Sequence, residues 1–311
     1  MSHTQRSGAL PQRGLLKPST RENLRIYWYN FRSNKLSIVG LIIVLISIYL
    51  ALFPQTVTHF PEHVKEFVDF ANAGQAPNAT YWFGTDTNGR DIFTRVIYSF
   101  RGALLMSIVV LAISVPIGTA LGLIAGYYHG TKIDTIIMRI TDIFLSMPPL
   151  IKIAAWPPVP TGIPPAPGIT PPRNSMLAIT IMWWPWYTRL VYSSTVSLSE
   201  EYFVKEAELI GASKLHILVK EILPNCLSPI LTKMALDVGW VILQGASLSF
   251  VGLGEQPPAP SFGTMISDGS KYMPDMWWIA IMPALGIIFI ILGFNFFGDG
   301  IRDMFDRGKQ S

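Results

Sequence analysis

The sequence predicts an all-α integral membrane protein with six transmembrane helices. Half of its 311 residues are hydrophobic and only 14% are charged, whereas soluble domains carry roughly 25% charged residues. Several apolar runs approach the roughly 20 residues that a helix needs to cross a bilayer. Lysine and arginine are concentrated in alternate polar connections, as expected of a multispan protein.

The chain divides into four predicted parts. Residues 1–34 form a basic N-terminal tail, 35–102 the first span and an external segment, 103–298 a core with five spans, and 299–311 a charged C-terminal tail. Apolar residues of the N-terminal tail recur at helical spacing, which predicts an amphipathic helix on the membrane surface, although a plain basic anchor explains the composition equally well. These residues are Leu24, Tyr27, Trp28 and Phe31.

The predicted spans are residues 36–53, 103–127, 133–156, 176–196, 231–253 and 277–297. The first and last contain no charged residue. In the second, Gly118, Gly122 and Gly126 recur every four residues and form a groove for close helix packing. The third is broken by prolines and leads into a proline-rich stretch, 156–173, which favours polyproline conformation. In the fifth, Lys233 and Asp237 lie four residues apart and are able to pair.

The external segment is polar and rich in turn-forming residues. It ends where a helix is expected to begin, with Asp91 in the first turn, where the helix dipole favours an anion. His59 and His63 lie four residues apart near two glutamates. This pattern is compatible with a metal site, but a solvated charged face explains it more simply.

The distribution of basic residues predicts the orientation. Six spans place both termini on one side, and the connections on that side hold 16 of the lysines and arginines, against 6 on the other. The excess of positive charge marks the cytoplasmic side. The sequence therefore predicts a multi-pass protein of the cell (inner) membrane with both termini in the cytoplasm.

Residues 199–225 form a polar stretch between the fourth and fifth spans, which we call the elbow. It is predicted to contain two short amphipathic helices, with Gly211 between them and Pro224 closing the second. An ordered polar segment between two spans indicates a docking surface. An interfacial amphipathic helix without a partner is the plainer alternative.

Motifs for enzymatic chemistry are absent from the sequence. It contains no G-x-x-x-x-G-K-[ST], H-E-x-x-H or G-x-S-x-G pattern, and Cys226 is its only cysteine. The net charge of +4 gives no indication of nucleic-acid binding. One alternative function is a secondary transporter or channel subunit that uses ionisable residues within the spans. Those residues are Arg139, Asp142, Lys152, Arg189 and Asp237.

The elbow resembles the cytoplasmic loop motif of permease subunits of binding-protein-dependent ABC importers. That motif is an E-A-A block, a glycine, nine residues and I-x-L-P. Gly211 and Pro224 have the expected separation, Lys205-Glu206-Ala207 occupies the E-A-A positions, and Glu221 replaces the isoleucine. The lysine and Glu221 depart from the motif, so either Glu206 replaces the usual glutamate in a shifted register or Lys205 faces an acidic partner.

Three further stretches resemble the second, C-type permease of the dipeptide/oligopeptide/nickel branch. They are Phe83-Gly84-Thr85-Asp86 with Gly89-Arg90-Asp91, residues 248–263, which contain Gly252-Leu253-Gly254-Glu255-Gln256-Pro257-Pro258, and residues 295–303. The proline-rich stretch 156–173 departs from the family pattern.

The resemblance implies a type I ABC importer permease fold with a cytoplasmic coupling helix. This chain would form half of a translocation pathway with a second homologous permease. Two ATP-binding subunits would use ATP and Mg, while this chain binds no cofactor. An extracytoplasmic solute-binding protein would deliver a peptide or similar solute, with oligosaccharide or nickel also compatible. Membrane lipid is the remaining partner, and no nucleic acid is implied.

The resemblance also implies which residues of the elbow couple to the ATPase: Lys205, Glu206, Ala207, Leu209, Ile210, Gly211, Ala212, Leu215, Leu218 and Pro224. Four of them would supply the apolar contact, namely Leu209, Ile210, Leu215 and Leu218. Gly211 would permit a tight turn, because a side chain there would crowd a neighbouring helix or the required backbone angles. Candidates for lining the pathway are Trp183, Trp186, Gln244 and Ser247.

Overall fold

The computed structural model describes residues 20–146, 173–255 and 258–306. All regular elements in these ranges are helices. The one β-type pairing within them is an isolated bridge between Thr85 and Asp91. The all-α prediction is therefore confirmed. The second half of the predicted third span and the proline-rich stretch up to residue 172 lie outside the described residues.

The N-terminal region contains α1 (Thr20–Ser33) and α2 (Lys35–Leu52). The tail contains a helix at the predicted place, α1, and some of its aromatic side chains pack against the protein itself. Phe31 is buried, with its ring centroid 6.0 Å from that of Phe297, and Tyr27 lies 5.7 Å from Phe305. Both partners belong to α11 (Trp278–Asp306). Trp28 stays exposed.

Four of the described helical segments are long and apolar enough to cross a membrane. They are Lys35–Leu52, Ile92–Tyr127, Lys214–Phe250 and Trp278–Phe305. Two further helices accompany them: α4 (Lys132–Ser146), which begins the predicted third span, and α6 (Arg173–Ser199), which contains the predicted fourth.

Helix α3 (Ile92–Tyr127) begins well before the predicted second span because Asp91 caps it. The Asp91 carboxylate accepts hydrogen bonds from the Thr94 backbone N–H at 2.9 Å and the Thr94 hydroxyl at 2.6 Å. Asp91 is thus the N-cap and not a residue of the first turn, since its own backbone is extended.

The glycine groove on α3 is confirmed. A Cβ atom at Gly118 would lie 2.5 Å from the Trp184 carbonyl oxygen, and one at Gly122 would lie 2.7 Å from that of Thr188. At Gly126 it would lie 2.6 Å from Thr195 Cβ. Because real Cβ atoms do not approach so closely, these glycines allow α6 to pack directly on the backbone of α3.

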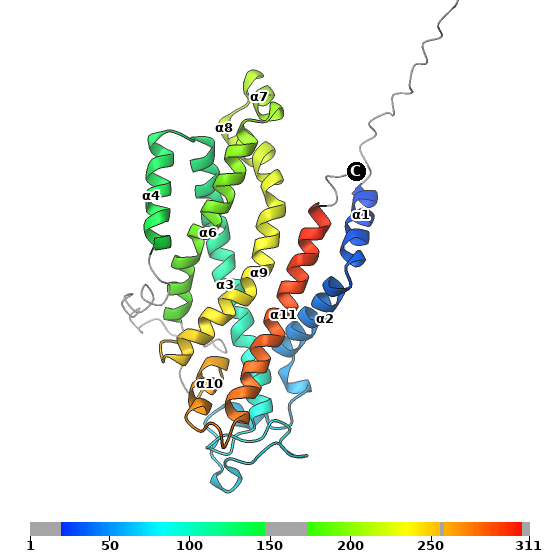
Figure 1. The fold of residues 1–311 in the computed structure, drawn as a ribbon, viewed down its shortest axis with the longest axis vertical. Coiled ribbons are helices and arrows are strands. Elements are labelled where there is room, and N and C mark those ends of the chain that lie inside the picture. Colours follow the sequence, from blue (N-terminus) through cyan, green and yellow to red (C-terminus); the bar gives the residue numbers. More distant parts are fainter. Residues whose placement is uncertain (1–19, 147–172, 256–257, 307–311) are drawn as a thin grey trace, which may run out of the picture.

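Along the long axis of the molecule, different sets of elements lie at the two ends (Figure 1). Helices α7 (Tyr202–Leu209) and α8 (Lys214–His216), the α3–α4 connection, α1 and the end of α11 lie toward one end of the molecule. The connection after α2 and helix α10 (Phe262–Ser270) lie at the other end. The elbow and the external segment are therefore at opposite ends of the helical body.

The external segment (residues 53–91) contains three short 3₁₀ helices, Pro54–Thr56, Pro61–Val64 and Phe70–Asn72. Asp86 organises its last turn: its carboxylate accepts from the backbone N–H groups of Asn88 and Arg90 and from Arg90 Nε at 2.7 Å. His63 is buried, and its Nδ1 accepts from the Asp91 N–H at 2.9 Å. A solvated face is therefore wrong for His63, and the described residues hold no His/Cys/Asp/Glu group suited to a metal.

Burial lowers the pKa of His63 below its usual 6.5, despite the opposing effect of nearby carboxylates such as Glu62. The neutral ring is also the form that the hydrogen bond needs, because a protonated Nδ1 has no lone pair to accept the Asp91 N–H.

Candidate functional site

The turn between the two helices of the elbow is a Schellman motif. The Ala212 N–H donates to the Ala207 carbonyl at 3.0 Å, and the Gly211 N–H donates to that of Glu208 at 3.0 Å. Gly211 has φ +81°, and a Cβ atom there would meet nothing within 4 Å. Of the two predicted reasons for glycine, the backbone angle is therefore correct and crowding of a neighbouring helix is wrong.

The second helix of the elbow does not end at Pro224. Ser213 caps α8 by accepting from the His216 N–H at 3.3 Å, and a π-helical segment, Ile217–Ile222, follows. Helix α9 (Leu223–Phe250) continues from it, with Pro224 in its first turn. The prediction that Pro224 closes the elbow is wrong, because the widened π turn leaves room for the proline ring and Pro224 adopts helical geometry.

The elbow is anchored to the helical body by apolar side chains. Val204, Ala207, Ile217 and Ile222 are buried in a core formed mainly by α3, α6 and α9. Because these residues belong to both halves of the elbow, the whole segment is fixed relative to the spans.

Two polar contacts hold the elbow to the end of α3. The Tyr127 hydroxyl donates to Glu208 Oε1 at 2.8 Å, and Lys214 Nζ lies 5.1 Å from the ring centroid of Tyr128. Sequence reasoning missed both contacts, since the partners are distant in the chain and no local pattern pairs them.

The predicted coupling residues separate into two groups. Leu209, Ile210 and Leu215 are 87%, 84% and 71% exposed. Lys205, Glu206 and Gly211 are exposed beside them. In the other group, Ala207 is buried, and Ala212 and Leu218 pack against the core from partly buried positions. Tyr202, which sequence reasoning passed over, is 84% exposed on the same segment.

Two of the predicted pathway residues, Trp183 and Trp186, lie beside the same ion pair of α9. Trp183 Nε1 donates to Asp237 Oδ2 at 2.9 Å, and Lys233 Nζ donates to Asp237 Oδ1 at 3.0 Å, which confirms the predicted pairing. Trp186 is 53% exposed, and the Lys233 ammonium lies 5.8 Å from its ring centroid. Gln244 and Ser247 are partly exposed on α9.

The ionisable residues of the spans are largely satisfied by one another. Besides the Lys233–Asp237 pair, Arg189 Nη2 donates to Asp142 Oδ1 and so connects α6 with α4. Local pairing of this kind accounts for these charges without an ion pathway.

Comparison with known proteins agrees with this geometry. The family described as "binding-protein-dependent transport system inner membrane component" matches residues 118–311. The chain belongs to this family. The family described as "N-terminal TM domain of oligopeptide transport permease C" matches residues 23–77. The chain is accordingly a multi-pass membrane permease subunit of a binding-protein-dependent ABC importer and not an enzyme, so the secondary-transporter alternative is wrong.

Several relatives are similar over nearly the full chain. The dipeptide transport system permease protein DppC of Alkalihalophilus pseudofirmus is 39% identical over 282 residues, covering 90% of this chain and 88% of the relative. The probable D,D-dipeptide transport system permease protein DdpC of Escherichia coli is 36% identical, covering 92% and 93%. A glutathione transport system permease protein, GsiD of Escherichia coli, is 35% identical, covering 97% and 96%.

Proposed function

We propose that this permease forms half of a membrane pathway for short peptides, and that its elbow docks on an ATP-binding subunit in the cytoplasm. The complete importer would contain a second homologous permease, two ATP-binding subunits and an extracytoplasmic solute-binding protein. The ATP-binding subunits would use ATP and Mg, and both termini of this chain would be cytoplasmic. The peptide class is carried over from the dipeptide and glutathione relatives.

The observation that carries the docking proposal is the exposed apolar surface of the elbow. Leu209, Ile210 and Leu215 lie at the end of the molecule beyond the spans, on a segment anchored by buried residues. Large apolar side chains exposed together on an ordered segment are typical of an interaction surface. The outward contact is assigned to these three residues and Tyr202, while Ala207, Ala212 and Leu218 position the segment from within.

Copurification of the complex tests docking. Replacing Leu209→Asp and Leu215→Asp together should remove the ATP-binding subunits from the purified complex while the second permease remains bound. Tyr29→Asp is a matched control, because Tyr29 is 74% exposed toward the same end of the molecule but lies on α1. Retention of the ATP-binding subunits by the double variant would contradict the proposal.

Labelling of introduced cysteines tests orientation. The natural Cys226 is fully buried and should give little background. A membrane-impermeant maleimide applied to intact cells should label Asn78→Cys in the external segment and leave Ser213→Cys in the elbow unlabelled until the membrane is permeabilised. The opposite pattern would reverse the proposed orientation.

A further inference from the structure

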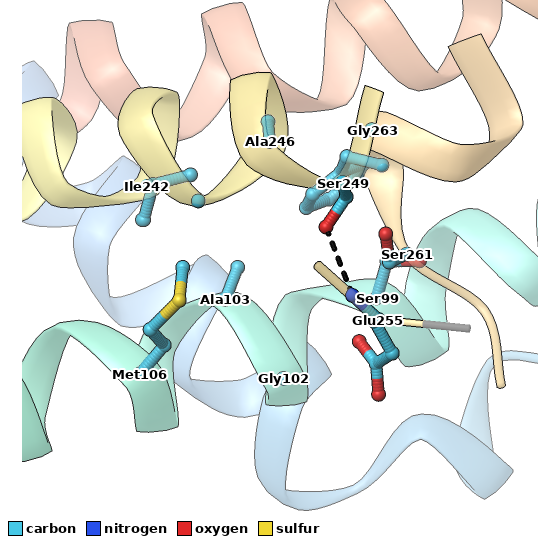
Figure 2. A pocket seen from close by; sticks show the side chains of 12 residues that line it. Ser99, Gly102, Ala103, Met106, Ile242, Ala246, Ser249, Glu255, Ser261 and Gly263 are labelled. Atoms are coloured by element: carbon cyan, nitrogen blue, oxygen red, sulfur yellow. Dashed lines mark hydrogen bonds between the residues drawn. The ribbon is translucent and has the colours of Figure 1, made fainter. Parts of the chain in front are cut away.

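Helices α3, α9 and α10 border a small, partly open hollow of about 30 Å³, large enough for a single ammonium group, toward the end of the molecule that carries the external segment. Figure 2 shows its walls: Gly102 and Ala103 come from α3, and Ala246 and Ser249 come from α9. Gly102 borders the hollow on α3, whereas Gly245 and Gly263 are packed closely against Met106 and Ala246. The hydroxyls of Ser99, Ser249 and Ser261 give the hollow a partly polar lining. One lining residue is ionisable, Glu255.

The backbone places Glu255 in this hollow. Helix α9 ends in a second Schellman motif, in which the Leu253 N–H donates to the Leu248 carbonyl at 2.9 Å and Gly252 has φ +81°. The Glu255 N–H then donates to Ser249 Oγ at 3.2 Å (Figure 2). The carboxylate reaches across to α3, where Glu255 Oε2 would lie 3.5 Å from a Cβ atom at Gly102. Even a methyl group at that position would touch the carboxylate in ordinary van der Waals contact.

The carboxylate has no charged partner among the described residues. Every other residue lining the hollow is uncharged and non-titratable. Of the two arginines on α3, Arg101 is exposed, and Arg95 contacts the Pro258 carbonyl and Asp86. Burial raises the pKa of Glu255 to about 7. A carboxylate in such a setting is stabilised by a cation that brings its own hydrogen-bond donors.

The chemistry of the hollow favours an ammonium group over a metal ion. Metal sites in proteins combine several ligands, whereas the described residues provide a single carboxylate here and contain no group of three metal-ligating side chains. An ammonium group needs one anion and neutral acceptors. Glu255 supplies the anion. Each serine hydroxyl already takes part in a hydrogen bond, since Ser99 donates to the Arg95 carbonyl, Ser249 accepts from the Glu255 N–H and Ser261 accepts from the Thr264 N–H. Each oxygen nevertheless has a further lone pair with which to accept.

We propose that Glu255 and the surrounding hollow bind the protonated amino terminus of the peptide as it enters the pathway. This inference rests on the proposed peptide-import function. It gives this permease a specificity element of its own, separate from the solute-binding protein, for solutes that carry a primary ammonium group.

The test uses the complete importer in proteoliposomes with its solute-binding protein. Uptake of a dipeptide is compared between wild type and Glu255→Gln from pH 5.5 to 7.5, where the dipeptide amino group, with a pKa of about 8, stays mostly protonated. The same solute-binding protein serves every variant, so its own pH dependence cancels in the ratio of the two rates. Asp275→Asn is the matched control, because Asp275 is an exposed acid on the α10–α11 connection.

Glutamine resembles the protonated acid. The ratio of wild-type to Glu255→Gln uptake should therefore rise from near one at pH 5.5 to about tenfold at pH 7.5, as expected for the loss of a charged hydrogen bond. Raising the dipeptide from limiting to saturating should shift the wild-type midpoint to lower pH, because a bound ammonium stabilises the carboxylate. Glu255→Asp should restore part of the pH dependence, and Asp275→Asn should keep the wild-type profile.

Three results would overturn the inference. They are a ratio that stays constant with pH, a midpoint that does not respond to dipeptide, and loss of the second permease from purified Glu255→Gln, which would assign the carboxylate to a basic residue of that partner. If wild type itself imports no dipeptide, the proposed function fails first and the inference fails with it.

Discussion

The elbow and the external segment both connect membrane helices with short ordered turns, and both contain a glycine with nearly the same backbone angle. Gly211 has φ +81° and Gly89 has φ +75°. Their surroundings differ completely. A Cβ atom at Gly211 would meet nothing within 4 Å, while one at Gly89 would lie 2.0 Å from the Asp69 carbonyl oxygen.

The polar side chains of the two segments also differ in their burial. In the external segment, His63, Asp86 and Asp91 are buried and accept hydrogen bonds within the segment or from its junction with α3. In the elbow, Leu209 and Ile210 are 87% and 84% exposed, and the external segment also exposes an apolar side chain, Phe70, at 77%. Both segments therefore expose apolar side chains, and they differ in that the external segment buries a network of hydrogen-bonded polar side chains, in which Asp91 Oδ1 is left without a partner among the described residues.

The strongest test of this contrast replaces one glycine with alanine in the external segment and one in the elbow. Gly89→Ala should lower the free energy of unfolding by about 3 kcal/mol, because a left-handed alanine also overlaps Asp69. Gly211→Ala should cost about 1 kcal/mol, because only the backbone angle is unfavourable. Thermal unfolding of the purified complex checks the order, and equal shifts would break the comparison.

A bulkier residue at Gly211 should separate folding from coupling. Gly211→Val places a β-branched side chain in the left-handed region at a cost of about 2 kcal/mol. Because the site is open, the spans should assemble normally while the turn becomes distorted. Uptake by reconstituted vesicles should fall roughly tenfold or more relative to ATP hydrolysis. Unchanged uptake would show that the turn has no coupling role.

Removing the N-cap of α8 should also lower uptake, but by a smaller factor. Ser213→Ala removes the hydrogen bond to the His216 N–H, which is worth about 1 kcal/mol, and should lower uptake about fivefold. Ser213→Thr keeps the cap and serves as the matched control. Equal uptake by the alanine and threonine variants would mean that docking tolerates a frayed α8.

The smallest effect concerns pH at the external segment. Because the folded pKa of His63 is lowered, the unfolded segment binds more protons between that pKa and 6.5, so stability falls as pH drops through this window, by less than about 1.4 kcal/mol per unit. Hydrogen exchange of residues 60–95, corrected for intrinsic rates, should be faster at pH 5.5 than at 7.5.

Substitutions of the two histidines control this result. His63→Asn keeps an acceptor for the Asp91 N–H and should remove the pH dependence, while His59→Gln, at an exposed position, should retain it. A pH response at the elbow instead would contradict the assignment to His63.

Local patterns in the sequence predicted much of the fold. The apolar runs, the glycine groove on α3, the Lys233–Asp237 pair and the turn at Gly211 each depend on residues a few positions apart. Spacing within one helix fixes which side chains share a face. The same local information identified the elbow and its exposed Leu209.

Features that depend on distant contacts were not predictable in this way. The burial of Phe31 requires α11, the hydrogen bond of Tyr127 requires Glu208, and the neutral state of His63 requires the Asp91 N–H. The helix continues past Pro224 because a π-helical turn precedes the proline. No residue pattern indicated that turn. Leu218 was misplaced on the outer surface for a related reason, since the π turn changes which side chains face the core.

The uninterrupted helical path from Lys214 to Phe250 has a mechanical consequence. Its 37 residues span about 55 Å at about 1.5 Å per residue, which is enough to cross the whole membrane. One end carries the apolar surface of Leu215, and the other passes through the Gly252 turn to Glu255. Although the path bends along its length in Figure 1 and includes a π-helical stretch, its hydrogen-bonded backbone is continuous, so we expect a tilt imposed at the elbow to displace the Glu255 hollow as well.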